Sequence, residues 1–507
     1  MRESAPTAAA ASGWTSYEDV QQGQMTTDVE DDQTGLQAAR QLFKGEVVEP
    51  QTTHHVSANP IISTFQTNNM VQRIVSGLVL GAAVTVYLAL GPAAAPIYLC
   101  SFVVSVCNYE YAWLSHRIAY RFTVTYAHQS QDDDAAMEIV PLDVTSVAVS
   151  SLPFGSRHPK LVAGAVAVIA TGIVTIGFVL LQIHLFHYET VAYASIYQTP
   201  LVYTWMDFIL LVAISTWVTI YCAMLTPTLS SALNSVLQQF VYSLQLITFF
   251  TCYRYDTKCY SVGFTGVARM NVVVLVLINR VPWWRRLSKT QTITAVLHVI
   301  LDVVGFAYIA MLMNPVSSII MQIDEGARIA LGFLAVVWGV DTGAYFCGHL
   351  LSYVGYKRSH YLAPHISPNK DIEGSIGGIL VGIAATLLVD GCWSDMTGVA
   401  VDDELLALQR RARVWRIVFA VVGGAISRYG DLFASLLKRL AGVKDTGTLI
   451  PGHGGLLDRV DAMLFLGAVF VLYHRTGFPV GYDQIISQTY QYLLNQRFNI
   501  VSAQERP

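Results

Sequence analysis

Apolar segments of about membrane length recur along this chain of 507 residues, and they constrain its fold more than any other feature. About 20 apolar residues in a helix cross the hydrocarbon core of a bilayer. Because lipid cannot hydrogen-bond the backbone, each segment is predicted to be helical. Only 13% of the residues are charged, against about 25% in soluble domains. The predicted spans are residues 74–90, 96–113, 161–186, 201–225, 229–252, 292–313, 376–389, 414–438 and 460–473.

We therefore predict an all-α, polytopic integral membrane protein with about eight to ten transmembrane helices. An N-terminal transmembrane region is expected over residues 71–326. A C-terminal transmembrane region over residues 327–478 holds most of the candidate site residues, and residues 479–507 are expected to be a polar tail.

Residues 1–70 are polar and show no apolar period, so they are predicted to form a disordered tail. A transit peptide is rich in Arg and poor in acidic residues, whereas this segment opens with Arg2, Glu3 and Glu18. The apolar core of a signal peptide is also missing. We expect a cytosolic tail.

Several polar side chains fall within the apolar segments. Asp302 lies in the 292–313 segment, where a lone carboxylate is expected to be paired or to face a pore. Glu110 lies near the end of the 96–113 segment, and we interpret it as an interfacial residue. Polar amides recur at near-helical spacing in the 229–252 segment and are expected to face the bundle interior or a water-filled cavity, since lipid would leave them unpaired. These amides are Asn234, Gln238, Gln239 and Gln245.

Ionisable residues gather late in the chain, at the ends of the last two apolar segments. Asp431, Ser435 and Lys438 are spaced i, i+4 and i+7, which places them on one face of a helix. Asp458 and Asp461 are spaced i, i+3 at the start of the next helix. Ionisable groups are costly at membrane depth, so a set of this kind indicates a functional site.

The connection between these two helices carries Lys444 and Asp445 and ends in a Gly-His-Gly-Gly turn. Glycine tolerates positive φ and has no side chain, so the backbone of such a turn can approach a ligand closely. His453 in this turn could act as an acid or as a donor to phosphate, with a structural turn histidine as the alternative.

Carboxylates beside cations suit nucleotidyl transfer. A pair of carboxylates can hold Mg²⁺ while the ion keeps water and phosphate oxygens as its other ligands. Lys and Arg neutralise the charge on the transferring and leaving phosphates. The residues alone therefore predict a metal–phosphate site at a membrane interface.

The spacing of these residues resembles a family signature. With fixed spacing from Ser435 to Asp461, the chain is similar to the phosphatidate cytidylyltransferase (CDP-diacylglycerol synthase) family. The matching residues are Ser435, Leu437, Lys438, Arg439, Lys444, Asp445, Pro451, Gly452, His453, Gly454, Gly455, Asp458, Arg459 and Asp461.

The resemblance implies an enzyme that converts CTP and phosphatidate to CDP-diacylglycerol and pyrophosphate. Asp431 and Asp458 are then the first choices as Mg²⁺ ligands, with Asp461 in support and a second, monovalent cation left open. Ser435 has no His and Asp at triad spacing, so it is expected to be a ligand or a hydrogen-bond donor. Asp445 and His453 belong to the same catalytic set. The cations expected to hold phosphates are Lys438, Arg439, Lys444 and Arg459.

An upstream Asp-Thr-Gly-Ala-Tyr element begins at Asp341, directly after an apolar run. It is similar to an element of the family, which makes Asp341 a candidate substrate-binding residue. A helix-packing motif with one capped carboxylate is the equal alternative.

A Ser-Pro-Asn-Lys loop precedes the 376–389 segment and supplies the remaining candidates for substrate binding, Ser367, Lys370 and Glu373. The family usually shows Ser-Pro-Lys-Lys-Thr-x-Glu-Gly here, so Asn369 and Asp371 are departures. A loop of this kind at a helix start suits phosphate, because free N–H groups and the helix dipole face the ligand.

Two other functions stay open. A CTP-dependent lipid kinase, such as a dolichol or phytol kinase, would also be polytopic but would release CDP. An ion-coupled transporter would also place carboxylates beside broken helices. No P-loop motif occurs, which argues against an ordinary ATPase. The net charge of −4 leaves no basic surplus for nucleic acid.

The candidate residues are expected to share one side of the membrane. Their Lys and Arg content places that side in the cytosol, where CTP would bind, while phosphatidate would enter from the bilayer. The long polar N-terminal segment favours the endoplasmic reticulum over the mitochondrial inner membrane. A homodimer remains an open alternative to a single membrane-embedded chain.

Overall fold

The computed structural model gives the fold of the unit Met70–Pro507. The predicted tails at residues 1–70 and 479–507 lie outside the described part, except for two residues, and so does His453. The described residues are 69–92, 94–129, 147–193, 205–255, 261–281, 289–322, 326–356, 360–397, 403–447, 449–450 and 454–475.

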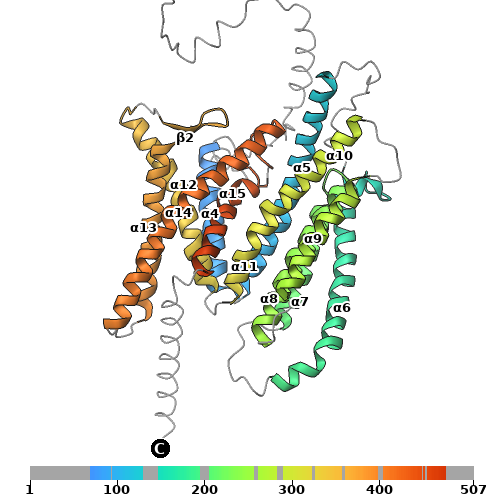
Figure 1. Cartoon of the computed structure of the whole chain (residues 1–507), viewed down its shortest axis with the longest axis horizontal. Helices are drawn as coiled ribbons and strands as arrows, with labels where there is room; N and C mark the ends of the chain where they lie inside the picture. Colours follow the sequence, from blue (N-terminus) through green and yellow to red (C-terminus); the bar gives the residue numbers. More distant parts are fainter. Residues whose placement is uncertain are drawn as a thin grey trace, which may run out of the picture. The chain divides into compact units, whose positions relative to one another are not determined.

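Helices account for most of the described residues (Figure 1). Between α10 and α11, a π-helical turn continues the helix over Phe306–Met311. The α-helices are α4 (Asn69–Leu90), α5 (Ala95–Gln129), α6 (Pro159–Tyr193), α7 (Trp205–Met224), α8 (Leu229–Tyr255), α9 (Ser261–Arg280), α10 (Lys289–Gly305), α11 (Leu312–Gln322), α12 (Gly326–Tyr353), α13 (Ile372–Thr397), α14 (Asp403–Ala441) and α15 (Leu457–Arg475).

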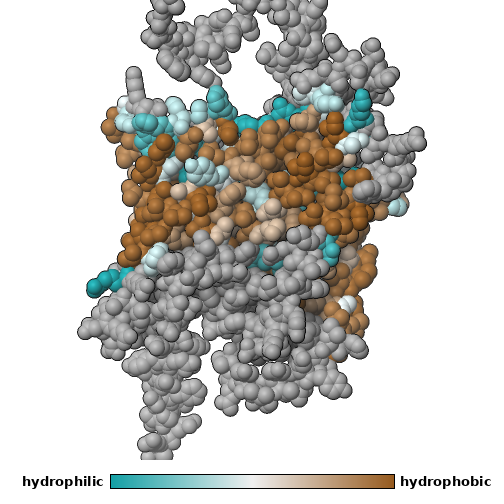
Figure 2. Space-filling model, in the orientation of Figure 1, coloured by the Kyte–Doolittle hydropathy of each residue, from teal (hydrophilic) through white to brown (hydrophobic). Residues whose placement is uncertain are grey.

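Within the described residues, five helical segments are long and apolar enough to cross a membrane. Apolar side chains cover the middle of the helices in Figure 2, while hydrophilic ones gather toward the upper edge. The chain is a mostly helical, multi-pass membrane protein, as predicted; the number of about eight to ten spans stays a prediction. The five segments are Pro159–Leu181, Met206–Met224, Gln291–Asn314, Ala330–Tyr353 and Ile417–Ala441, and the shorter apolar ones are Val75–Leu90, Asn271–Arg280 and Ile372–Leu388.

The expectation of an all-α fold is wrong in one detail. A short antiparallel hairpin of β1 (Tyr361–Ala363) and β2 (Ser367–Asp371) precedes α13, and β2 contains the predicted Ser-Pro-Asn-Lys loop. The sequence of β2 does not predict a strand, since Pro and Asn are poor strand formers. The hairpin pairs Tyr361 with Asp371 and Ala363 with Ser367.

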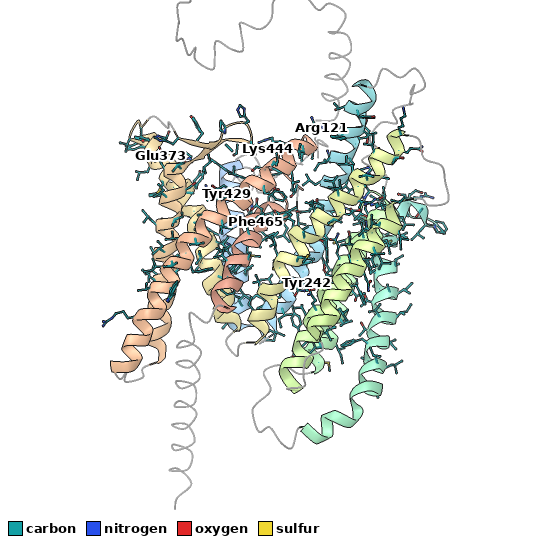
Figure 3. The ribbon with its side chains drawn as sticks, in the orientation of Figure 1. Arg121, Tyr242, Glu373, Tyr429, Lys444 and Phe465 are labelled. Carbon is teal, nitrogen blue, oxygen red and sulfur yellow. The ribbon has the colours of Figure 1, made fainter. Side chains whose placement is uncertain are left out.

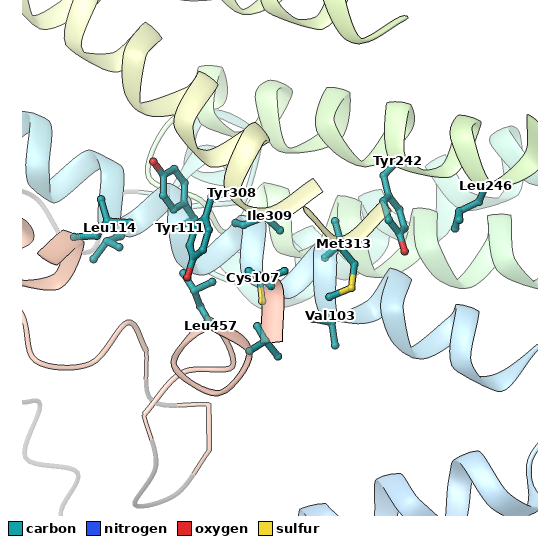
Figure 4. Packing of buried hydrophobic residues seen from close by; sticks show 14 of the residues in the cluster. Val103, Cys107, Tyr111, Leu114, Tyr242, Leu246, Tyr308, Ile309, Met313 and Leu457 are labelled. Carbon is teal, nitrogen blue, oxygen red and sulfur yellow. The ribbon is translucent and has the colours of Figure 1, made fainter. Parts of the chain in front are cut away.

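Helix α5 lies at the centre of the packing, in contact with α7, α8, α10, α11, α14 and α15. Its buried side chains Cys107 and Tyr111 belong to one cluster with Tyr308 of the π-helical turn and Leu457 of α15 (Figure 4). The Tyr111 hydroxyl donates to the Leu301 carbonyl at 2.8 Å. This cluster joins the N-terminal helices to the two helices that carry the candidate site.

Asp302 is buried and paired, as predicted, and the four amides of the 229–252 segment are buried inside the bundle. Asp302 accepts from Arg280 Nε at 2.5 Å and from Asn234 Nδ2 at 2.6 Å. Gln239 Nε2 donates to the hydroxyls of Ser101 and Ser215, and Gln238 and Gln245 are also buried. These contacts satisfy polar groups that lipid would leave unpaired.

Candidate active site

Asp431, Ser435 and Lys438 lie on one continuous stretch of α14, as their spacing predicted. The helix ends at Ala441, and the positive φ of 73° at the following Gly442 lets the Val443 N–H turn back to the Lys438 carbonyl at 3.0 Å. From α5, Arg121 Nη1 donates to the Arg439 carbonyl at 3.2 Å. The glycine turn after the helix and the Arg121 hydrogen bond from α5 thus fix the C-terminal end of α14.

Lys370 links the hairpin to α14. Its Nζ lies 2.6 Å from Asp431 Oδ1 and donates to Ser435 Oγ at 3.1 Å. Burial lowers the pKa of the Lys370 ammonium below its ordinary value, although Asp431 opposes this effect. The hairpin therefore places one cation directly on the polar face of α14.

Asp341 reaches the same carboxylate through Arg428, a residue that sequence analysis did not single out. Arg428 Nη1 lies 3.5 Å from Asp341 Oδ1 and 3.8 Å from Asp431 Oδ2. Arg428 precedes Asp431 by three residues, so an extension of the i, i+3 pattern backward would have found it. Close packing supports the alternative interpretation of the Asp341 element, because a Cβ on Gly343 would lie 2.5 Å from Val381 Cβ on α13, and the substrate-binding role of Asp341 stays a prediction.

Asp458 is held at the start of α15 by several donors. Its Oδ1 receives Lys438 Nζ at 2.8 Å, which joins α15 to α14. Its Oδ2 accepts the backbone N–H groups of Thr446 at 2.8 Å and Gly455 at 3.0 Å, and the Thr446 hydroxyl at 3.0 Å. Its side chain is only 4% exposed, so these donors offset the cost of burying the charge.

Asp461 lies deeper than Asp458. It is buried, accepts the Ala462 N–H at 2.7 Å and lies within electrostatic range of Asp431 and Asp341. Aromatic rings pack near these carboxylates: Tyr308, which lies within electrostatic range of Asp431, Asp458 and Asp461, is 5.1 Å from Phe433 and 5.9 Å from Phe465 between ring centroids. The carboxylates of α12, α14 and α15 thus share one region beside an aromatic cluster.

Glu110 of α5 also belongs to this region, although its position in the sequence suggested an interfacial residue. Its carboxylate accepts the N–H groups of Leu456 at 2.8 Å and Leu457 at 2.7 Å, where α15 begins. The contacts cross more than three hundred residues. No local spacing predicts them.

The remaining predicted residues lie around this centre. Glu373 accepts from His360 Nδ1 at 2.7 Å, and the His360 contact lowers the pKa of this carboxyl. Ser367 pairs with Ala363 in the hairpin, and Arg439 Nε donates to the Ile366 carbonyl at 3.3 Å. The exposed residues are Lys444, Asp445 and Arg459, and Lys444, Arg121 and Glu373 lie toward the same end of the helices in Figure 3.

Oxygen ligands for Mg²⁺ are present, although within the described residues no three His, Cys, Asp or Glu side chains form a ready metal cluster. Mg²⁺ is usually held by one or two carboxylates together with substrate phosphates and water. Asp431 and Asp458, with Asp461 nearby, fit that pattern, because each carboxylate oxygen can accept more than one contact.

A family model described as "Cytidylyltransferase family" matches residues 158–476, more than half of the chain. The chain belongs to the cytidylyltransferase family. The family resemblance of the sequence is therefore confirmed. The matched range contains the hairpin, α14 and α15, whereas Glu110 and Arg121 precede it.

Relatives named phosphatidate cytidylyltransferase match a shorter part of this cytidylyltransferase-family chain. The Staphylococcus epidermidis protein is 37% identical over 144 residues, which are 28% of this chain and 47% of that protein. The Thermotoga maritima protein is 38% identical over 146 residues (29% and 48%), and the Brucella suis protein is 40% identical over 139 residues (27% and 44%). The chain spans about half the length of the relatives that it matches.

Proposed function

We propose that this protein is a phosphatidate cytidylyltransferase, which forms CDP-diacylglycerol and pyrophosphate from CTP and phosphatidate. One observation carries the proposal: two carboxylates on neighbouring helices, Asp431 and Asp458, each contact a lysine, Lys370 and Lys438. Cations that neutralise these carboxylates in the free protein can turn to phosphates once a nucleotide arrives. The names of the partial relatives support the same substrates.

In the proposed reaction, a phosphate oxygen of phosphatidate attacks the α-phosphorus of CTP in line. The bond from the α-phosphorus to the oxygen that bridges to the β-phosphate breaks, and pyrophosphate leaves with that electron pair. A phosphomonoester has a second pKa of about 6, so the attacking oxygen is already ionised near neutral pH. The reaction needs no strong general base from the protein.

The chain's own residues would bind and orient the phosphates. Lys438 would move from Asp458 to the leaving pyrophosphate. Lys370 would hold a second phosphate, while the Ser435 hydroxyl keeps the Lys370 ammonium oriented. Arg428 can bridge Asp341 and Asp431 and so keep the α12 carboxylate near the nucleotide. Mg²⁺ bound by Asp431 and Asp458, with Asp461 in support, would supply positive charge that stabilises the negative charge developing on the phosphate oxygens.

The proposed orientation places the site in the cytosol. The hairpin, the end of α14 and the start of α15 carry Lys and Arg side chains, which favour the cytosolic face. Phosphatidate would then enter sideways from the bilayer while CTP arrives from the cytosol. We propose the endoplasmic reticulum as the membrane.

The test uses the purified full chain in detergent with phosphatidate, Mg²⁺ and CTP labelled in the cytosine ring or in the γ-phosphate. Ring label in an organic-extractable lipid, lost in Asp458→Asn, is the expected result. Thr386→Val is the matched control, since its buried hydroxyl donates only to the Gly382 carbonyl of its own helix. Transfer of γ-label to a lipid alcohol with release of CDP would instead identify a lipid kinase. No CTP turnover with any lipid would reject both enzymes and favour a transporter.

A further inference from the structure

The first N–H groups of α15 find their acceptors far away in the sequence. The first-turn N–H groups of a helix have no partner within the helix and need a cap. Leu456 and Leu457 donate to the two oxygens of Glu110, at 2.8 Å and 2.7 Å, while Gly455 donates to Asp458 at 3.0 Å. A carboxylate on α5 therefore caps the helix that carries Asp458 and Asp461.

The signature turn is shaped to admit this carboxylate. Glu110 is 3% exposed, and a Cβ on Gly455 would lie only 2.5 Å from its Oε2. A Cβ on Gly447 would lie 3.0 Å from its Oε1. A buried carboxylate without a cation is stable only with several donors, and the positive end of the helix dipole favours it further.

One hydroxyl is shared between Glu110 and Asp458. Thr446 Oγ1 lies 3.1 Å from Glu110 Oε2 and 3.0 Å from Asp458 Oδ2. A hydroxyl carries one hydrogen, so it donates to only one of them at a time. When Asp458 turns toward a cation, the Thr446 hydroxyl can pass to Glu110, and the loop stays anchored.

We propose that Glu110 is a positioning residue for Asp458: it fixes the start of α15 so that Asp458 can bind Mg²⁺ without loss of the surrounding loop. The magnesium part of this inference rests on the proposed function. Glu110 acts through backbone N–H groups and the Thr446 hydroxyl, not through contact with substrate. It lies before residues 158–476, the range that matches the family.

Glu110→Gln tests this inference, because the amide keeps the size of the side chain but one of its two acceptors becomes a donor. Hydrogen exchange at the Leu456 and Leu457 amides is expected to accelerate at least about tenfold, because one charge-assisted hydrogen bond is lost. The Mg²⁺ concentration for half-maximal CDP-lipid formation should rise about 10- to 100-fold, as for other residues that orient metal ligands. Stabilisation by Mg²⁺ alone in thermal unfolding should weaken in parallel.

The matched control is Ser115→Ala on the same helix, whose buried hydroxyl donates only to the nearby Ala112 carbonyl. It should leave all three readouts unchanged. A Glu110→Gln variant that unfolds at lower temperature but keeps the wild-type Mg²⁺ requirement would overturn the proposal, because it would show a structural role alone. Unchanged exchange at Leu456 and Leu457 would overturn it as well.

Thr446 gives a second test that removes no carboxylate. Thr446→Val should raise the Mg²⁺ requirement, whereas Thr446→Ser, which keeps the hydroxyl, should restore it; equal behaviour of the two variants would contradict the shared hydrogen bond. If the wild type turns over no CTP, the proposed function fails, yet hydrogen exchange and Mg²⁺-dependent unfolding still test the role of Glu110.

Discussion

Two buried ionic clusters lie among the membrane helices, and they differ in how completely their charges are paired. In the Arg280 cluster (Ser231, Asn234, Arg280 and Asp302), Arg280 Nε and Nη2 reach the two oxygens of Asp302 at 2.5 Å and 3.1 Å. The side chains of this ion pair are 7% and 8% exposed. Arg280 also donates to the Ser231 hydroxyl, and Asn234 donates to Asp302. We call the Arg280 cluster closed, because its charges are paired with one another.

In the α14–α15 site (Lys370, Arg428, Asp431, Ser435, Lys438, Asp458 and Asp461), the lysines meet the carboxylates through single-point contacts. Lys370 and Lys438 each contact one oxygen of a carboxylate, and Asp431 remains 24% exposed. A bidentate Arg–carboxylate pair is hard to exchange, whereas a lysine is a point charge that can move to a phosphate. The comparison teaches that buried charge alone is too little to propose a reactive site; the proposal for the α14–α15 site rests on exchangeable lysine contacts and on a partly exposed carboxylate.

The largest expected effect is on catalysis at the α14–α15 site, which we call the open site because Asp431 remains partly exposed. Asp431→Asn removes a carboxylate that both Lys370 and Arg428 face. CDP-lipid formation should fall about 10³-fold or more, since even one electrostatic donor is worth about 10²–10³ in rate. Steady-state rates at saturating Mg²⁺, together with the unfolding temperature, measure this. A variant that loses stability but keeps its rate would place Asp431 with the closed cluster instead.

The next effect is on stability at the closed cluster. Arg280→Met leaves Asp302 buried without its cation, which should cost about 3–5 kcal/mol of unfolding free energy. The rate per folded molecule should stay at the wild-type value. Thermal unfolding in detergent and rates normalised to folded protein check both parts. Arg280→Met combined with Asp302→Leu should recover stability, because no charge is then left unpaired; a rate loss in the folded double variant would argue against a structural role.

Local spacing in the sequence was enough to predict which residues share the polar face of α14. Asp431, Ser435 and Lys438 come together because a helix brings i, i+4 and i+7 to one side, whatever the tertiary fold. The pairing of Asp302 was also predictable, because a lone carboxylate at membrane depth requires a partner. Its identity was not, since Arg280 comes from another helix.

Long-range contacts mark where sequence reasoning stopped. Glu110 was interpreted as interfacial because it lies near the end of an apolar segment, and only the fold brings it to Leu456 and Leu457. The hairpin was missed because Pro368 and Asn369 disfavour a strand, although Asp371 at its end caps α13 by accepting the Gly374 N–H at 3.1 Å. Tertiary context decided both cases.

A smaller effect concerns pH at the open site. Because burial lowers the pKa of Lys370, its ammonium loses its proton as pH rises through that lowered value, and its attraction for phosphate is lost above it. The KM for CTP should therefore rise on the alkaline side. Lys370→Arg should move this rise to higher pH, since arginine stays charged, and Lys370→Met should raise the KM about tenfold at all pH values. The exposed Lys160 at the start of α6 provides the control: Lys160→Arg should leave the profile unchanged, and an unshifted profile in Lys370→Arg would remove Lys370 from CTP binding.

The smallest effect compares two serines with the same local chemistry. Ser435 Oγ accepts Lys370 Nζ at 3.1 Å in the open site, and Ser231 Oγ accepts Arg280 Nη2 at 3.0 Å in the closed one; both serines are buried. Ser435→Ala should raise the KM for CTP a few-fold, because Lys370 loses the acceptor that orients it, with little change in unfolding temperature. Ser231→Ala should lower stability by about 1 kcal/mol and leave the KM unchanged. KM and unfolding temperature measured on both variants decide the matter: if the two serines move the same quantity, the difference in pairing between the clusters has no functional meaning.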